Sequence, residues 1–233
     1  MISSLLFLAI QTFAAVPSTL SPLELLSLPE GNRVEIAKKN AKNLYPQLME
    51  MAFNEERSVP TRWKALILAA EINREGSSKD LDRALRHNEW FMRNAALMAL
   101  KTANPPRAQA AALQLLSDKA LVVRSAAVSS IEEKPSDEVR DVLWNELRAP
   151  YNFRQGQGLW IRREIVEKLA AHPERREFNS FVTAFKDADK DLHSAAMMAF
   201  EKITGKHFGN QKSTVQEREA LWMDYLKKNP TIR

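Results

Sequence analysis

A block of residues that opens with a basic side chain recurs along this chain at a fixed spacing. Arg62, Arg93 and Arg124 recur with a period of about 31 residues, and the same interval separates Arg162 from His193. The step from Arg124 to Arg162 is longer, because seven extra residues interrupt one repeat. A period in this range predicts a solenoid, in which each unit buries its apolar face by stacking on its neighbours.

The same offsets from the opening residue are filled by apolar residues in every block. Offsets of three, four and seven residues fall on one stripe of an α-helix, so each block predicts an amphipathic helix. Small residues at offset three allow neighbouring helices to approach closely. The stripe comprises Ala65, Ala96, Ala127, Ile165 and Ala196, then Leu66, Leu97, Val128, Val166 and Met197, and finally Ala69, Leu100, Ile131, Leu169 and Phe200.

A proline-containing break follows several of these helices and leads into a second amphipathic stretch. Proline disfavours helix in the residue before it and is well accommodated in the first turn of a helix. The sequence therefore predicts an all-α fold, an α-solenoid of stacked antiparallel helical hairpins. The expected second helices cover about 78–88, 106–117, 136–147 and 174–186, and helices at about 33–54 and 214–228 are expected to cap the ends.

The blocks resemble HEAT repeats of the short type first associated with phycobilisome lyases. The pattern is clearest from Asp118 to Ala127, where an acid is followed by Val-Arg-x-x-Ala-Ala. The tail Ile203–Gly209, followed by Trp222, is similar to the closing segment of many bacterial HEAT-repeat proteins. The resemblance covers about residues 55–228 and implies a scaffold or binding surface more than an activity.

The resemblance also implies a role for the acid and the arginine of each repeat. The acid is expected to cap the opening helix, and the arginine to bridge to a neighbouring repeat. Asp118 with Arg124, Glu56 with Arg62, and Asp187 with His193 fit these roles by spacing. The blocks also depart from the pattern, since His193 replaces the arginine in the last copy and Gly156 stands six residues before Arg162, where an acid is usual.

The N-terminus favours export of the protein. An apolar run from Leu5 to Val16 is too short to span a bilayer and ends in small residues, which is typical of a signal peptide, although the usual Lys or Arg before the run is missing. A misassigned start or a buried N-terminal helix is the alternative. We expect a signal peptide at 1–18, a capping region at 19–58, repeats at 59–213 and a C-terminal capping helix at 214–233. The mature protein is then periplasmic or secreted, with no membrane anchor.

Nothing in the sequence predicts an enzyme, a metal site or a cofactor. The chain has no cysteine, which excludes disulfides and a thiolate nucleophile, and its four histidines lie far apart in the sequence. Asp187, Asp189 and Asp191 resemble the start of a calcium loop, but Leu192 replaces the required glycine and Met198 the bidentate glutamate. A helix cap between repeats is the expected role of these acids. Trp63, Trp144 and Trp222 are expected to be core or cap residues.

The insertion near 149–158 is the candidate binding site. Between Arg148 and Arg163 the chain has four arginines, three aromatic residues and no acid. Arginine beside aromatic rings suits carboxylates, phosphates or stacked rings, and insertions in repeat proteins often emerge on the binding face. Gly156 and Gly158 are expected to make the loop flexible, and packing of Trp160 into the core is the competing interpretation. The predicted partner-binding residues are Arg148, Tyr151, Phe153, Arg154, Trp160 and Arg163.

These features favour a non-enzymatic scaffold that binds a protein or peptide through its concave face and the insertion. The alternative is a nucleic-acid-binding protein similar to HEAT-repeat DNA glycosylases, which predicts clustered arginines and a steep salt dependence. The near balance of 34 basic and 29 acidic residues argues against it. A bilin lyase or chaperone-like activity is implied only by the family resemblance.

Overall fold

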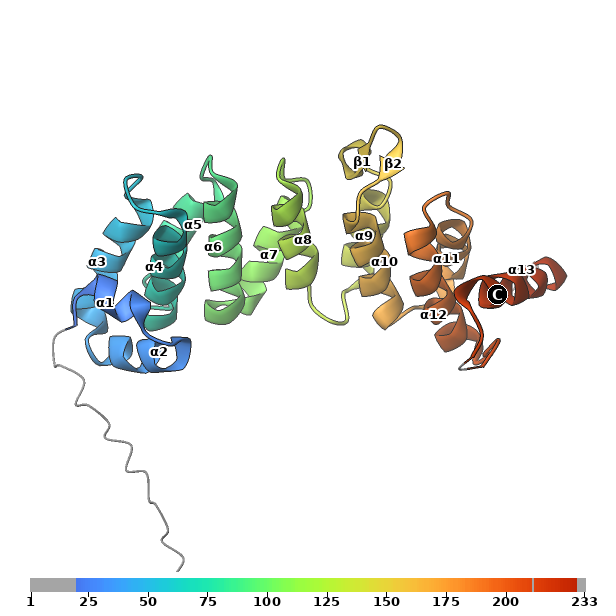
Figure 1. The fold of residues 1–233 in the computed structure, drawn as a ribbon, viewed down its shortest axis with the longest axis horizontal. Helices are drawn as coiled ribbons and strands as arrows, with labels where there is room; N and C mark the ends of the chain where they lie inside the picture. Colours follow the sequence, from blue (N-terminus) through green and yellow to red (C-terminus); the bar gives the residue numbers. More distant parts are fainter. Residues whose placement is uncertain (1–19, 211, 230–233) are drawn as a thin grey trace, which may run out of the picture. The chain divides into compact units, whose positions relative to one another are not determined.

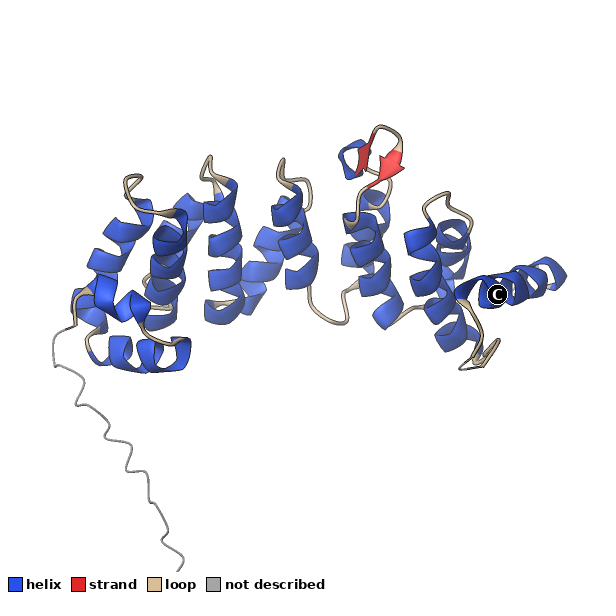
Figure 2. Ribbon diagram, in the orientation of Figure 1, coloured by secondary structure: helices blue, strands red, loops and turns tan. Residues whose placement is uncertain are grey.

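The described residues fold into α-helices joined by short loops, with one two-stranded sheet (Figures 1 and 2). The structure is a computed structural model that describes residues 20–210 and 212–229. The expected signal peptide at 1–18 lies outside the described residues. No helix in the described ranges is long and apolar enough to cross a membrane. The chain divides into two compact units between Ile72 and Asn73.

The first unit contains four helices in its described part. They are α1 (Pro22–Ser27), α2 (Glu30–Lys39), α3 (Ala41–Phe53) and α4 (Val59–Ile72). The single helix expected at 33–54 is therefore wrong, because the chain breaks at Asn40. This residue leaves the helical region with φ −130° and ψ 31°, and its side chain accepts a hydrogen bond from the side-chain amide of Asn43. Asparagine favours such local bonds over helix continuation.

The second unit alternates the two kinds of helix that the repeats predict. The first helices are α6 (Trp90–Ala103), α8 (Leu121–Ser130), α10 (Ile161–Ala171) and α12 (His193–Thr204). The second helices are α5 (Ser78–Leu85), α7 (Pro105–Leu115), α9 (Asp137–Glu146) and α11 (Phe178–Phe185), and α13 (Val215–Lys228) closes the unit. The first helices contact one another in chain order, from α6 to α12. This nearest-neighbour stacking is that of an α-solenoid.

The predicted apolar stripe forms the core. All fifteen side chains at offsets three, four and seven are buried, with no more than 3% of any of them exposed. Proline begins α7 as expected, and the Asn104 side chain caps this helix by accepting a hydrogen bond from the Arg107 amide. The apolar positions that the sequence places on one helical face are therefore the positions that are buried in the structure.

Candidate functional site

A buried basic residue stands at the start of each repeat's first helix, and we call this set the basic ladder. Its members are Arg62, Arg93, Arg124, Arg162 and His193, each no more than 6% exposed. Burial of a cation is costly unless it is paired and hydrogen-bonded. The ladder must therefore find acceptors inside the stack.

In the second unit, Arg93, Arg162 and His193 each bind an acid of the element that follows their own repeat. Arg93 holds the Asp118 carboxylate with two hydrogen bonds of 2.6 and 2.7 Å. Arg162 binds Asp187 at 2.7 Å and Asp189 at 2.9 Å. His193 has Nδ1 3.0 Å from a carboxylate oxygen of Glu219 on α13. The arginine thus bridges to a neighbouring repeat, as the family resemblance implies.

Within its own repeat, the basic residue binds a main-chain carbonyl instead of the acid's carboxylate. Arg124 donates to the carbonyl oxygen of Asp118 at 2.7 Å, and His193 Nε2 lies 3.0 Å from that of Asp187. The carboxylate of Asp118 also accepts from the Ala120 amide and so caps the turn before α8. These two implied pairs are therefore in contact, but their carboxylates serve the preceding repeat.

The first repeat uses a different acceptor. Arg62 Nε donates to the carbonyl oxygen of Ala52 at 3.1 Å. Ala52 belongs to α3, so this bond joins the two helices of the first unit that precede the regular stack.

Hydrogen bonds lower the pKa of two ladder carboxylates, Asp118 and Asp187, against the opposite effect of their burial. Burial acts to raise the pKa of Asp118, but bonds from Arg93 and the Ala120 amide outweigh it and lower the pKa. The pKa of Asp187 is lowered in the same way, because hydrogen bonds from Arg162 and from the Asp189 amide outweigh the effect of burial. The acids resembling a calcium loop are thus ladder partners and caps, and Asp189 caps the turn that begins at Lys190.

Arg124 has no acid at the corresponding place. Ala149 stands after Arg124 where Asp118 stands after Arg93 and Asp187 after Arg162. The insertion supplies the missing acceptor, because Arg124 donates to the main-chain oxygen of Tyr151 at 3.0 Å and lies 5.5 Å from the centre of the Tyr151 ring. The insertion therefore completes the ladder at a repeat boundary where the pattern lacks an acid.

The insertion is an ordered hairpin, contrary to the expected flexible loop. A 3-10 turn (Pro150–Asn152) leads into β1 (Phe153–Arg154), which pairs with β2 (Gln157–Gly158) in antiparallel register. The two-residue turn between them has φ 52° at Gln155 and 78° at Gly156. Positive φ at both central residues matches the twist of a tight hairpin. The hairpin stands at the junction of α9 and α10 (Figure 1).

Gly158 is needed where the hairpin meets the ladder. A Cβ atom at this position would overlap the Asp189 carboxylate and lie 2.6 Å from Arg162 Nη1. Asn152 fixes the base of the hairpin, since its side chain donates to the Glu146 carbonyl and its carbonyl accepts from the Leu159 amide. Gly156 thus allows the tight turn, and Gly158 allows the hairpin to approach the ladder closely.

Two of the six predicted binding residues anchor the hairpin. The Phe153 ring lies 4.4 Å from the Arg162 guanidinium and covers it. The Tyr151 hydroxyl donates to Glu146 at 2.6 Å, and burial together with this bond raises the pKa of Tyr151 to about 12. These aromatic residues hold the hairpin against two successive ladder arginines, Arg124 and Arg162.

The other four predicted residues are exposed, as is Tyr151, 41% of which is exposed. Trp160 is 43% exposed at the start of α10, so packing into the core is not its role. Arg163 follows about one helical turn later and lies 3.6 Å from Glu167. Among the described residues, the side chains of Arg148 and Arg154 have no hydrogen-bond or ion-pair partner. The structure thus presents arginines and an indole ring at and around a fixed hairpin.

A second buried ion pair was missed by the sequence reasoning. Arg140 on α9 binds both carboxylate oxygens of Glu177, and the Trp144 indole donates to the same carboxylate at 2.8 Å. Arg140 and Trp144 are four residues apart, so they share a helix face. That spacing was the available signal, but the partner lies 37 residues from Arg140 across an irregular repeat.

The described residues contain no group of three or more His, Asp or Glu that could hold a metal ion. Trp144 and Trp222 are buried, as expected for core and cap residues, whereas Trp63 is only partly buried.

Comparison with known proteins identifies the repeats. Residues 45–144 match a family described as HEAT repeats. No curated protein matches the chain. HEAT repeats stack into scaffolds whose extended surfaces bind other proteins.

Proposed function

Because this chain is a HEAT-repeat protein, we propose that it is a non-enzymatic scaffold that binds an acidic protein or peptide segment. The binding surface is the hairpin edge, defined as Arg148, Arg154, Trp160 and Arg163. The second helices, which solenoids of this kind present on their concave face, extend the contact. The proposal includes export to the periplasm or the exterior, which the apolar N-terminal sequence supports.

The observation that carries this proposal is the positive charge of Arg148 and Arg154, which have no partner among the described residues, at a hairpin that is fixed to the ladder; Arg163 beside them is paired with Glu167. Ordinary surface arginines are flexible and often lie near acids, whereas residues 147–163 contain no acid. Arg154 stands on a hairpin that Tyr151 and Phe153 fix to buried arginines. A preorganised arginine loses less entropy when it binds a carboxylate, and Trp160 adds apolar contact area.

The experiment is quantitative recovery of partners on immobilised protein. The site variant is Arg154→Glu with Trp160→Ala, and the matched control is Lys212→Glu with Met98→Ala, which changes one exposed cation and one exposed apolar residue of the same unit away from the second helices. We expect the site variant to recover at least about tenfold less partner than the unchanged protein, because charged hydrogen bonds and an aromatic anchor are removed. The control is expected to retain it.

Equal recovery on both variants would overturn the assignment to the hairpin edge. Recovery that disappears on nuclease treatment and falls steeply with salt would instead favour the nucleic-acid alternative.

A further inference from the structure

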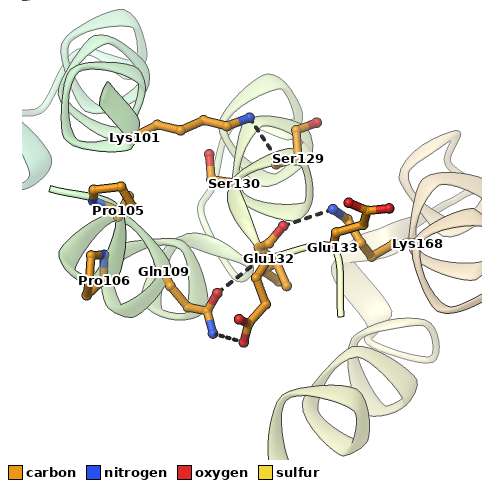
Figure 3. A pocket seen from close by; sticks show the side chains of 11 residues that line it. Lys101, Pro105, Pro106, Gln109, Ser129, Ser130, Glu132, Glu133 and Lys168 are labelled. Carbon is orange, nitrogen blue, oxygen red and sulfur yellow. Dashed lines mark hydrogen bonds between the residues drawn. The ribbon is translucent and has the colours of Figure 1, made fainter. Parts of the chain in front are cut away.

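A cavity of about 720 Å³ is lined by residues at the ends of the first helices α6 and α8 and by Lys168 of α10 (Figure 3). It lies beside the last turn of α8, with Lys101 of α6 and Lys168 of α10 on its wall. Pro105 and Pro106, which are exposed, contribute apolar surface. Its volume falls within the range of small-molecule sites, which combine an apolar lining with a few polar groups.

Two ammonium groups converge on this cavity. Lys101 Nζ donates to the Ser129 carbonyl at 3.0 Å, and Lys168 Nζ donates to the Ile131 carbonyl at 2.9 Å. In Figure 3 the two lysines reach the end of α8 from different sides. An ammonium has three N–H donors, so each lysine keeps donors beyond these bonds. Burial is the main cause that lowers the pKa of Lys168, and the positive charge of Lys101 lowers this pKa further.

The acids of the cavity wall are held by other residues. Gln109 binds Glu132 twice, with its amide nitrogen 2.7 Å from the carboxylate and its amide oxygen 3.0 Å from the Glu132 main-chain nitrogen. Glu133 lies 3.0 Å from His172 Nε2 and only partly offsets the charge of Lys168. Among the described residues, no carboxylate forms an ion pair with either lysine of the cavity.

We propose that this cavity binds a carboxylate carried on an apolar body. The carboxylate lies between Lys101 and Lys168, where it accepts their remaining N–H donors and relieves their mutual repulsion. The apolar body packs on Pro105 and Pro106. The proposal is independent of the hairpin edge, because the two sites share no residue.

Lys202 provides an internal control for the structural role of such lysines. Its ammonium donates to the carbonyl oxygens of Ala170 and Ala171 at 3.1 and 2.7 Å, at the end of α10. It thus caps a helix end as Lys101 and Lys168 do, but it does not line the cavity. A ligand site should depend on Lys101 and Lys168 and not on Lys202.

The test is an NMR titration of the full chain with hexanoate, followed through the amide signals of residues 129–133. Hexanamide supplies the same apolar body without the charge, and a blocked Leu-Glu dipeptide presents the carboxylate as a protein side chain would. We expect Lys101→Gln with Lys168→Gln to weaken hexanoate binding at least about tenfold, since two charged donors are lost. Lys202→Gln should change it by less than about twofold, and hexanamide should not compete.

Tighter binding of the dipeptide than of hexanoate would assign the site to a protein ligand, and the reverse order to a free metabolite-like acid. The single variant Lys101→Gln, which changes an exposed side chain, keeps the test valid if the double variant is unstable. The proposal is overturned if hexanoate causes no shift at residues 129–133, or if all three lysine variants bind it alike. The Arg154→Glu, Trp160→Ala variant should bind hexanoate normally, which separates this result from that of the hairpin edge.

Discussion

At the scale of single residues, the stack depends on where each buried charge finds its partner. Asp118 and Asp187 each lie six residues before the basic residue of their own repeat, so each lies 25 residues after the ladder arginine that it binds in the preceding repeat. The acid caps its own helix and binds the preceding repeat's arginine at the same time. Each such carboxylate therefore connects two repeats.

Removal of one such carboxylate should strongly destabilise the second unit. Asp118→Ala leaves Arg93 buried with only the carbonyl oxygens of His87 and Asn88 as acceptors. We expect a loss of about 3 kcal/mol in the free energy of unfolding, measured by urea denaturation. Asp141→Ala, which removes an exposed partner of Arg176, should cost less than about 1 kcal/mol. Similar losses in the two variants would contradict this role of the ladder.

The lowered pKa of Asp118 predicts that the folded protein loses stability at acid pH. The pKa of Asp118 is lower in the folded protein than its ordinary value, so its stabilising contribution is present above the ordinary carboxyl pKa of about 4. That contribution is lost as the pH falls through the folded-state value. Asp118→Asn keeps the shape and removes the titration, so its urea midpoint should fall less between pH 5 and pH 3 than that of the unchanged protein. Parallel falls would show that Asp118 is not linked to stability.

At the scale of elements, the insertion is held by specific contacts and is not a tolerated loop. The sequence predicted where it would occur and that it would carry exposed arginines. It did not predict the hairpin, because two-residue strands have too little alternation to recognise and Gln155 is an unusual residue at positive φ. It also could not separate Tyr151 and Phe153, which contact ladder arginines, from Trp160, which is about as exposed as Tyr151 but has no ring or cation contact among the described residues. That distinction depends on contacts with Arg124 and Arg162, one of which is across the repeat boundary.

Gly158→Ala should displace the hairpin from the ladder. The added methyl group overlaps Asp189 and crowds Arg162, so one of these side chains or the strand must move. Overpacking of this kind costs about 1–3 kcal/mol, which a denaturation experiment detects. Gly31→Ala is the matched control, since a Cβ atom there meets nothing within 4 Å. A Gly158→Ala variant as stable as the control would refute the close approach.

At the scale of the whole molecule, the repeat period was sufficient to predict an all-α solenoid, because burial follows the stripe from Ala65 to Phe200. The break at Asn40 was not predicted, since the first unit lies largely outside the repeat pattern and no period marks its boundaries. The C-terminal cap was predicted, and α13 buries Trp222 completely against Phe200 and Phe208. A solenoid requires such caps to cover its last repeat.

Trp222→Ala should therefore destabilise the end of the second unit. Truncation of a fully buried tryptophan costs about 3–5 kcal/mol, and amide hydrogen exchange should accelerate first in α12 and α13. Leu221→Ala, next to it but 45% exposed, should have little effect on either measurement. Unchanged exchange in α13 of the Trp222 variant would contradict the capping role.

The measurement that most directly tests the proposed function is site-specific photo-crosslinking in cells. A benzophenone amino acid replaces the exposed Gln157 on the hairpin or, as a control, the exposed Met98 on the first helix α6. We predict a discrete protein adduct from position 157 that is reduced several-fold when Arg154→Glu is added, and no such adduct from position 98. Adducts of equal yield from both positions, or an adduct from position 157 that Arg154→Glu leaves unchanged, would contradict binding at the hairpin edge.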